Sequence, residues 1–584
     1  MKAKKAIEKM YLKELPNHIL MVIILNINAI VDSIFAGMFL NQDALSAIAY
    51  YAPISNIAYL SSIFVLGSNL ICCREIGCGN KKKAVSVVST GFFAVFLYCF
   101  ALAALLIFAG PVLCNILGTP GNINLILYMK SMAINLIAST VFGFCMNYLP
   151  MNDKGRIGKI ALTLLIILNC LANYVFIVHF NMGILGLGMA SSVSSMFAAG
   201  LALSGFFSKN KEKLAVYISV KEINPVLLRD IIISGVQEFT FNMSLAIRGL
   251  ALNYVVTSVA GTSGMAALIV FNIYVCFTGA ISHGTGGAIA CLGSICYGED
   301  SLGEFIDMIK FALKNALLMA AVCVLGTFLI SKNLSMAFFD YGSQTYEITV
   351  SMFRICCWTL IFEQFTKSIL SAYMCQNEIM LSNSLTLFPN IVTAILFFPL
   401  SLIWGINGVW MSFLATSFLT LMLIFVIVLI RNKRIPECIH DIIITDTEFG
   451  AGGAHTFSMS VNKLEDVSRC SISLDKFLQD YSINSRRRYF MSLSVEELLR
   501  NILEHGHKHE NGHLIDCIAV VKNGKIQIHI KDNLKEFDPC AYLEQFASDD
   551  PTQNIGLKLV GKIVDEMSYK RVHGFNIISF ASMQ

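Results

Sequence analysis

The chain has 584 residues, of which 55% are hydrophobic and only 14% are charged, and its net charge is +4. A soluble globular protein carries about 25% charged residues, so this composition excludes an ordinary soluble enzyme, and it also excludes a disordered chain. These averages combine two unlike parts. Residues 1–434 carry a net charge of +9 and have the composition of a membrane domain, whereas residues 435–584 carry −5 and are numerous enough to bury a core of their own.

Residues 1–434 contain twelve apolar runs that are long enough to cross a bilayer as helices, which takes roughly 20 mostly apolar residues each. The runs lie near residues 16–40, 54–76, 86–110, 125–149, 157–179, 185–207, 230–256, 263–290, 308–331, 346–374, 380–402 and 407–431. Lys and Arg concentrate before the first run and after the second, fourth, sixth and twelfth. Because basic loops stay on the cytoplasmic side, we expect a multi-pass protein of the cell membrane with both termini in the cytoplasm.

The two halves of this membrane domain repeat each other. Residues 43–54 align with residues 262–273 at an offset of 219, and residues 183–195 align with residues 405–417 at an offset of 222. Two similar six-helix lobes around a central cavity are typical of transporters. We therefore expect one lobe over about 1–215 and the other over 216–434.

The apolar runs resemble the multidrug and toxic compound extrusion (MATE) family. The resemblance is carried by the stretch from LPNHILMVIILNINAIVDSIFAG to GSNLICCREIGCGNKKKA, by LNCLANYVFIV and by GILGLGMASS, and it covers about residues 10–432. It implies an antiporter that exports small organic or drug-like compounds by alternating access. The coupling ion would be H⁺ or Na⁺, and no ATP would be hydrolysed within the membrane.

Asp32 is the only acidic residue in the middle of a first-lobe run. An ionisable residue inside the membrane is costly and usually faces a cavity, although such a carboxylate can also cap a kinked helix. The resemblance implies that Asp32 takes up the coupling ion and that Asn169, Asn173 and Ser191 stand near it. Asn173 replaces an Asp of many family members, and the single remaining carboxylate favours either H⁺ as the coupling ion or a weakened ion site. The alternative for the two Asn residues is that they only hold helices together.

The second lobe carries charged residues inside its runs as well. Glu238 and Arg248 lie in the seventh run, and Glu363 and Lys367 lie in the tenth. Glu363 and Lys367 are four residues apart, so they can neutralise each other on one helix face. The alternative is that these four residues line a polar cavity that recruits the substrate.

Residues 435–452 form a linker to a domain over residues 453–584. In this domain we expect a strand at 455–461, helices at about 463–480 and 484–508, and strands at 515–522 and 525–532, followed by a helix and a final pair of strands. The turn at Asn523–Gly524 is a strong hairpin signal. This order predicts an α+β two-layer sandwich, and it resembles the GHKL ATP-binding fold, in particular the anti-sigma-factor serine kinases.

Three stretches carry this second resemblance, namely Glu497-x-x-x-Asn501, IKDNLKEFDP and NIGLKLVGKIVDEMSY. It implies that ATP and Mg²⁺ are the cofactors, with Asn501 as the Mg²⁺ ligand and Glu497 as the catalytic carboxylate. It implies that the adenine amino group donates to Asp532. The other ATP-binding residues implied by the resemblance are Phe537, Gly556 and Lys558. Leu534 and Asn554 stand where the family has glycines. The sequence therefore leaves open whether the domain only binds ATP, hydrolyses it or uses it to phosphorylate a serine.

We therefore expect a cation-coupled exporter with a cytoplasmic nucleotide-binding regulatory domain. One alternative is a membrane sensor whose kinase-like domain acts on a cytoplasmic protein partner, and another is a flippase of lipids or cell-wall precursors. No nucleic-acid partner is expected. The basic loops and the acidic C-terminal domain further predict that the two parts dock through opposite charges, which salt would weaken.

Overall fold

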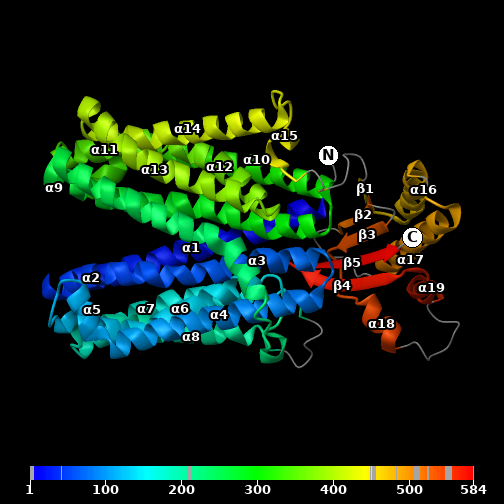
Figure 1. The fold of residues 1–584 in the computed structure, drawn as a ribbon, viewed down its shortest axis with the longest axis horizontal. Coiled ribbons are helices and arrows are strands. Elements are labelled where there is room, and N and C mark those ends of the chain that lie inside the picture. The colour runs from blue at the N-terminus through cyan, green and yellow to red at the C-terminus, as the bar shows by residue number, and fades with distance from the viewer. Residues whose placement is uncertain are drawn as a thin grey trace.

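We describe the protein from a computed structural model over residues 5–40, 42–207, 214–446, 449, 456–481, 483–505, 513–522, 525–545 and 555–582. A bundle of long helices meets, at one end, a five-stranded sheet whose far side is covered by further helices (Figure 1). The structure therefore combines a helical membrane domain with a two-layer sandwich, as the sequence predicts.

The first lobe and the connection after it are almost entirely helical. The elements are α1 (Ala6–Phe39), α2 (Gln42–Ala58), η1 (Tyr59–Ser61), α3 (Ser62–Gly77), α4 (Lys81–Phe108), α5 (Gly110–Ile116), α6 (Ile123–Tyr148), α7 (Gly155–Asn173), the π-helix η2 (Tyr174–His179), α8 (Gly183–Ser204) and η4 (Val220–Glu222). The second lobe consists of α9 (Leu227–Gly298), α10 (Leu302–Met336), α11 (Gln344–Cys356), α12 (Thr359–Cys375), α13 (Ile379–Trp404) and α14 (Ile406–Asn432), and α15 (Ile439–Ile443) follows it.

Helix α9 contains 72 residues, and a straight helix of this length would measure roughly 108 Å at 1.5 Å per residue, far more than one crossing needs. Its backbone leaves the helical conformation at Gly261, where φ is 52°, a value that glycine adopts readily. Within the described residues, ten helices are long and apolar enough to span a membrane, and the bent pair of α11 and α12 makes eleven. Dividing α9 at Gly261 gives the twelve expected crossings.

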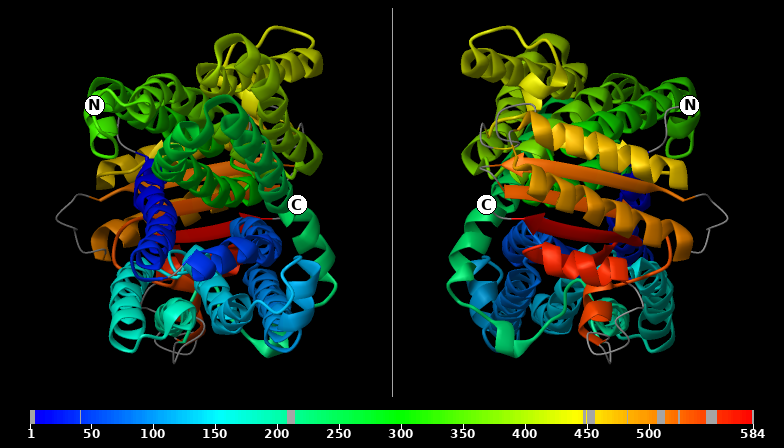
Figure 2. Two further views of the ribbon diagram at one scale, coloured as in Figure 1. Left: turned by 90° about the vertical axis from the view of Figure 1, so that its left-hand side faces the viewer. Right: turned by 90° about the vertical axis from the view of Figure 1, so that its right-hand side faces the viewer.

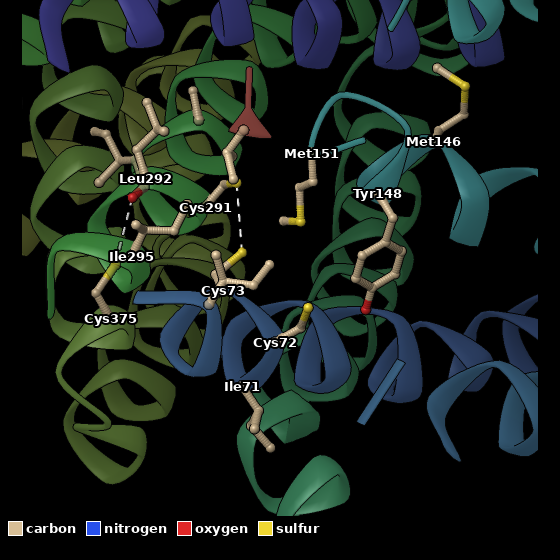
Figure 3. Close-up of a cluster of buried hydrophobic side chains, with 14 of the residues drawn as sticks. Ile71, Cys72, Cys73, Met146, Tyr148, Met151, Cys291, Leu292, Ile295 and Cys375 are labelled. Atoms are coloured by element: carbon tan, nitrogen blue, oxygen red, sulfur yellow. Dashed lines mark hydrogen bonds between the residues drawn. The ribbon is translucent and has the colours of Figure 1, made fainter. Parts of the chain in front are cut away.

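The two lobes touch most closely where α3 meets α9. A Cβ atom at Gly67 would lie 1.9 Å from the carbonyl oxygen of Ile231, and one at Gly235 would lie 1.9 Å from that of Ile63. Only glycine permits such an approach of two backbones. Farther along the same two helices, Cys73 and Cys291 bring their sulfur atoms within 3.6 Å in a buried cluster (Figure 3).

The sheet belongs to the C-terminal part of the chain. Its strands are β1 (Thr456–Ser460), β2 (Ile515–Lys522), β3 (Lys525–Asp532), β4 (Glu566–Val572) and β5 (Phe575–Ser582), all antiparallel to their neighbours in the order β1-β2-β3-β5-β4. Its helices are α16 (Leu464–Asp480), α17 (Ser485–His505), α18 (Pro539–Gln545) and α19 (Ile555–Ile563). The predicted hairpin turn at 523–524 lies outside the described residues.

Strand β3 shows how the two faces of the sheet are used. Its side chains alternate between faces: Ile526, Ile528 and Ile530 enter the core beneath the sandwich helices, and Lys531 points the other way, toward the membrane domain. Phe575 and Ile577 of β5 share a core cluster with side chains of the membrane helices. The sheet therefore stands between the ends of the membrane helices and helices α16, α17 and α19 (Figures 1 and 2).

Candidate functional site

The first candidate site surrounds Asp32, where three helices of the first lobe converge. Asn169 and Asn173 lie one turn apart on α7 and therefore share a face. Their Nδ2 atoms donate to Asp32 Oδ1 over 3.0 and 2.8 Å, and Ser191 Oγ on α8 donates to Asp32 Oδ2 over 2.7 Å. The structure thus brings together the four residues that the sequence singled out in the first lobe.

One oxygen of this site is unused. Asn173 Oδ1 is buried and has no hydrogen-bond partner among the described residues, and an unpaired buried acceptor is costly. Directly after Asn173 the chain continues as the π-helix η2, a conformation that often marks functional sites. A carboxylate beside a free amide oxygen can take up H⁺ or a small hard cation. The sequence pattern did not indicate the π-helix.

The second candidate site is a cavity of about 350 Å³ in the second lobe, which also reaches Asn26 of α1. Arg248, Glu363 and Lys367 line it, whereas Glu238 is not among its lining residues. Ser282 Oγ donates to Glu363 Oε2 over 3.5 Å, and Lys367 Nζ lies 4.6 Å from the centre of the Phe241 ring. Among the described residues, Glu363 and Lys367 do not form an ion pair, because their charged atoms are more than 4.0 Å apart. Both charges face a space large enough for a small organic molecule.

The third candidate site is a cavity of about 360 Å³ in the sandwich, between α17, α19 and the ends of β3 and β5. Asn501, Asp532 and Phe537, all implied by the resemblance, line it. Asp532 Oδ1 accepts hydrogen bonds from the backbone N–H of Leu534 over 2.9 Å and from Asn576 Nδ2 over 2.8 Å. Burial raises the pKa of Asp532 to about 6, so it is mostly ionised at neutral pH.

The remaining residues implied by the second resemblance lie around this cavity rather than in its wall. Glu497 is one helical turn before Asn501 on α17, and it is not among the lining residues. Gly556 and Lys558 belong to α19, whose Leu557 does line the cavity. Asn554 lies outside the described residues. Asn576, which orients Asp532, was missed, although its polar side chain in an otherwise apolar strand was a usable signal.

The sheet face opposite this cavity is held to the membrane domain by buried ion pairs. Lys531 is 1% exposed, and its Nζ donates to Glu299 over 2.7 Å and to Glu304 over 2.5 Å. Lys570 Nζ lies 3.3 Å from the other oxygen of Glu299, and Lys522 pairs with Asp300 over 2.7 Å. Burial opposes ionisation of Glu299, but the two lysines lower its pKa to about 2.

These contacts correct the expected polarity of docking. We expected basic loops of the membrane domain to meet an acidic C-terminal domain. Instead, the turn between α9 and α10 and the first turn of α10 supply the carboxylates, and the sheet supplies the lysines. Net charge is a sum over a whole domain, whereas docking depends on the few side chains that are buried between the two parts.

A chain of hydrogen bonds leads from Asp532 to the membrane domain. Asn576 Nδ2 donates a hydrogen bond to Asp532, and Asn576 Oδ1 accepts one from Arg571 Nη1 over 2.8 Å. Arg571 Nε in turn donates to Asp153 Oδ2 over 3.3 Å. Asp153 lies in the loop between α6 and α7, and α7 carries Asn169 and Asn173. The cavity that Asp532 lines is thus linked to α7, the helix that contacts Asp32.

Comparison with known proteins agrees with both resemblances. Residues 18–175 match the MatE family model, and residues 461–581 match the model of a histidine kinase-like ATPase domain. The multidrug export protein MepA of Staphylococcus aureus (strain bovine RF122 / ET3-1) is 20% identical over 413 residues, which is 70% of this chain and 90% of that protein. MepA of strain MRSA252 matches with the same identity and coverage.

Solved structures match the membrane domain. A MOP superfamily transporter from Pyrococcus furiosus superposes with a TM-score of 0.63 at 17% identity, over 72% of this chain and 97% of that one. A multidrug resistance MATE family transporter in an outward-facing conformation superposes with a TM-score of 0.65 at 18% identity, over 71% of this chain and 94% of that one. At such identities the match establishes the fold, and the predicted fold class is confirmed.

Proposed function

We propose that this chain, which joins a MATE transporter domain to a histidine kinase-like ATPase domain, exports organic compounds across the cell membrane in exchange for H⁺, under the control of its ATPase domain. The observation that supports H⁺-coupled export is the convergence of Asn169, Asn173 and Ser191 on Asp32. The printed name of the S. aureus relative, a multidrug export protein, supports drug-like substrates.

The polar groups around Asp32 suit a proton cycle. An ionised carboxylate only accepts hydrogen bonds, and the Nδ2 of Asn173 donates one to it over 2.8 Å. A protonated carboxyl group donates one, and a half-turn of the Asn173 amide, which would release its 3.1 Å hydrogen bond to Asn169 Oδ1, would present the unpartnered Oδ1 to it. The same side chains thus serve both protonation states. With a single carboxylate the site provides little charge for Na⁺, which supports H⁺ as the coupling ion.

We place the ATPase domain and both termini in the cytoplasm. An even number of crossings puts Ala6 and Asn432 on the same side of the membrane. The sheet contacts that side, since the backbone N–H of Ala6 donates to Asp516 of β2 over 2.6 Å. The basic loops support the cytoplasmic assignment of this side.

The residues of the sandwich cavity fit a bound adenine nucleotide. Asp532 presents a buried acceptor to the adenine amino group, Phe537 and Tyr542 supply aromatic surface, and the Asn501 amide oxygen is a suitable ligand for Mg²⁺. ATP would supply the phosphates that complete the Mg²⁺ coordination. Glu497 stands one turn from Asn501, the place from which a carboxylate can act on a water or hydroxyl held near the phosphates.

Regulation of the transporter itself is favoured over action on a separate protein. The sheet face that would be free in an independent domain is occupied by Glu299 and Glu304. A nucleotide that contacts Asp532 would also act on Asn576, Arg571 and Asp153 through their hydrogen bonds. Nucleotide can shift the transporter between its two orientations only if it binds them with different affinity, and this hydrogen-bonded chain provides a route for that difference.

Removing the Asp532 carboxylate should weaken nucleotide binding. We expect Asp532→Ala to lower the affinity of the full-length protein for ATP about 10- to 100-fold, because a buried charged acceptor is lost. Isothermal titration calorimetry with a non-hydrolysable analogue would measure this. Asp475→Asn, which alters a carboxylate on α16 that does not line the cavity, is the matched control and should bind normally. Equal affinity of Asp532→Ala and the wild type for ATP would contradict the proposed nucleotide site. It would not affect the proposal that the chain transports organic compounds.

Nucleotide affinity should depend on pH through Asp532. Its pKa is about 6, so the carboxylate is ionised and accepts above this value, and it becomes protonated as the pH falls through it. We expect binding to weaken about tenfold between about pH 8 and about pH 5. The nucleotide also titrates, so the control is Asp532→Asn, which cannot change charge. A wild-type profile parallel to that of Asp532→Asn would contradict this role.

A further inference from the structure

A third large cavity lies where the two domains meet, and of its lining residues only Asp153 and Arg571 enter the proposals above. Its volume is about 620 Å³, and its walls come from the start of α1, the start of α7 and the turn between β4 and β5. Five cationic side chains line it, which are Lys9, Lys13, Arg156, Lys159 and Arg571.

The two carboxylates of this cavity are already engaged. Asp153 pairs with Arg571 over 3.3 Å, and the buried Glu14 pairs with His573 over 3.0 Å. Among the described residues, no carboxylate lies within 4.0 Å of the charged group of Lys9, Arg156 or Lys159. These cations repel one another across a shared space, so the cavity is suited to an anion that neutralises several of them at once.

The surroundings indicate the kind of anion. On α7, Arg156 shares one helix face with Ile160, Ile167 and Leu171, which are 60%, 51% and 56% exposed. On the neighbouring α1, Lys13 shares a face with the exposed Leu20. Exposed apolar side chains of membrane helices face acyl chains. The basic cavity thus lies at the cytoplasmic end of two lipid-facing stripes, where phospholipid headgroups are found.

We propose that this cavity binds a phosphate group, and that its source is the headgroup of an anionic phospholipid whose acyl chains lie along α7 and α1. Arg571 comes from the ATPase domain, and the other four cations come from the membrane domain. The bound phosphate therefore connects the two domains beside the hydrogen-bonded chain from Asp532 to Asp153. This site is independent of the proposed transport and nucleotide functions, because binding alone tests it.

The test uses the full-length protein in detergent. Short-chain phosphatidylglycerol, phosphatidylcholine and inorganic pyrophosphate are titrated separately, and binding is followed by native mass spectrometry and thermal shift. We expect phosphatidylglycerol to bind, and Arg156→Gln with Lys159→Gln to weaken this binding about 10- to 30-fold. The charge-conserving pair Arg156→Lys with Lys159→Arg should retain it, which shows that the charges matter and that the fold is intact.

The matched control is a second pair of basic residues at the cytoplasmic end of a lipid-facing stripe. Lys310 and Lys314 of α10 precede the exposed Leu318, Val322 and Leu325 on one helix face, but they do not line this cavity. Lys310→Gln with Lys314→Gln should leave phosphatidylglycerol binding within about twofold of the wild type. An equal loss in both double variants would mean that only general surface charge attracts the lipid. Equal binding of phosphatidylcholine, or binding of pyrophosphate at the same concentrations, would also overturn the proposed lipid.

Discussion

Transport is expected to stop when Asp32 is replaced by Asn. The amide of Asn has nearly the shape of the carboxylate, so the packing of α1 against α7 and α8 should survive, but an amide takes up no proton in this pH range. The cycle then lacks the step in which proton uptake changes the hydrogen bonds to Asn169, Asn173 and Ser191. We expect drug efflux to fall to the background of empty vesicles rather than to a reduced rate.

The measurement is efflux of a fluorescent organic cation from proteoliposomes under an imposed pH gradient, repeated under an imposed Na⁺ gradient. Asp43→Asn, at the exposed start of α2, alters a second first-lobe carboxylate and should transport normally. Nucleotide binding by Asp32→Asn checks that the chain is folded. Wild-type efflux by Asp32→Asn would show that Asp32 is not the coupling residue. Efflux driven only by the Na⁺ gradient would show that H⁺ is the wrong ion.

The Asp32 constellation illustrates what could be predicted from the sequence. Asp32, Asn169 and Asn173 are polar in otherwise apolar runs, so each stands out in a single sequence. Ser191 does not, since it is one of four serines within residues 191–195. The spacing of the constellation along the chain matched a known family, and that match supplied the long-range pairing of α1 with α7 and α8. Without it, the four-residue spacing of Asn169 and Asn173 indicates only that these two share a helix face.

The docking face shows what could not be predicted. In KIQIHIKD the alternation correctly places Ile526, Ile528 and Ile530 in one core. The same alternation places Gln527, His529 and Lys531 on what appears from sequence to be a water-exposed face. The partners of Lys531 precede it by more than 220 residues, and no local pattern links them. Arg571 was missed for the same reason, because its role depends on its contact with Asp153, which is made across the fold.

The buried pairing of Lys531 should be essential for holding the ATPase domain against the transporter. Lys531→Met keeps the length of the side chain but leaves Glu304 buried without a cation and leaves Glu299 with Lys570 alone. Breaking a buried pair by removing one partner costs about 3–5 kcal/mol. We expect the two domains to separate, which hydrogen exchange should report as faster exchange in β3 and at the turn between α9 and α10.

Two further variants separate this explanation from a general loss of stability. Lys525→Met removes a lysine from the same strand, but its partner Glu566 is exposed, so the cost should be below about 1 kcal/mol and the exchange unchanged. Lys531→Met combined with Glu304→Met removes both charges and leaves the pair of Glu299 with Lys570. Because an unpaired buried carboxylate is the expected source of the cost, this double variant should recover much of the protection that the single variant loses. If it recovers none, the contact depends on the shape of Lys531 rather than on its charge.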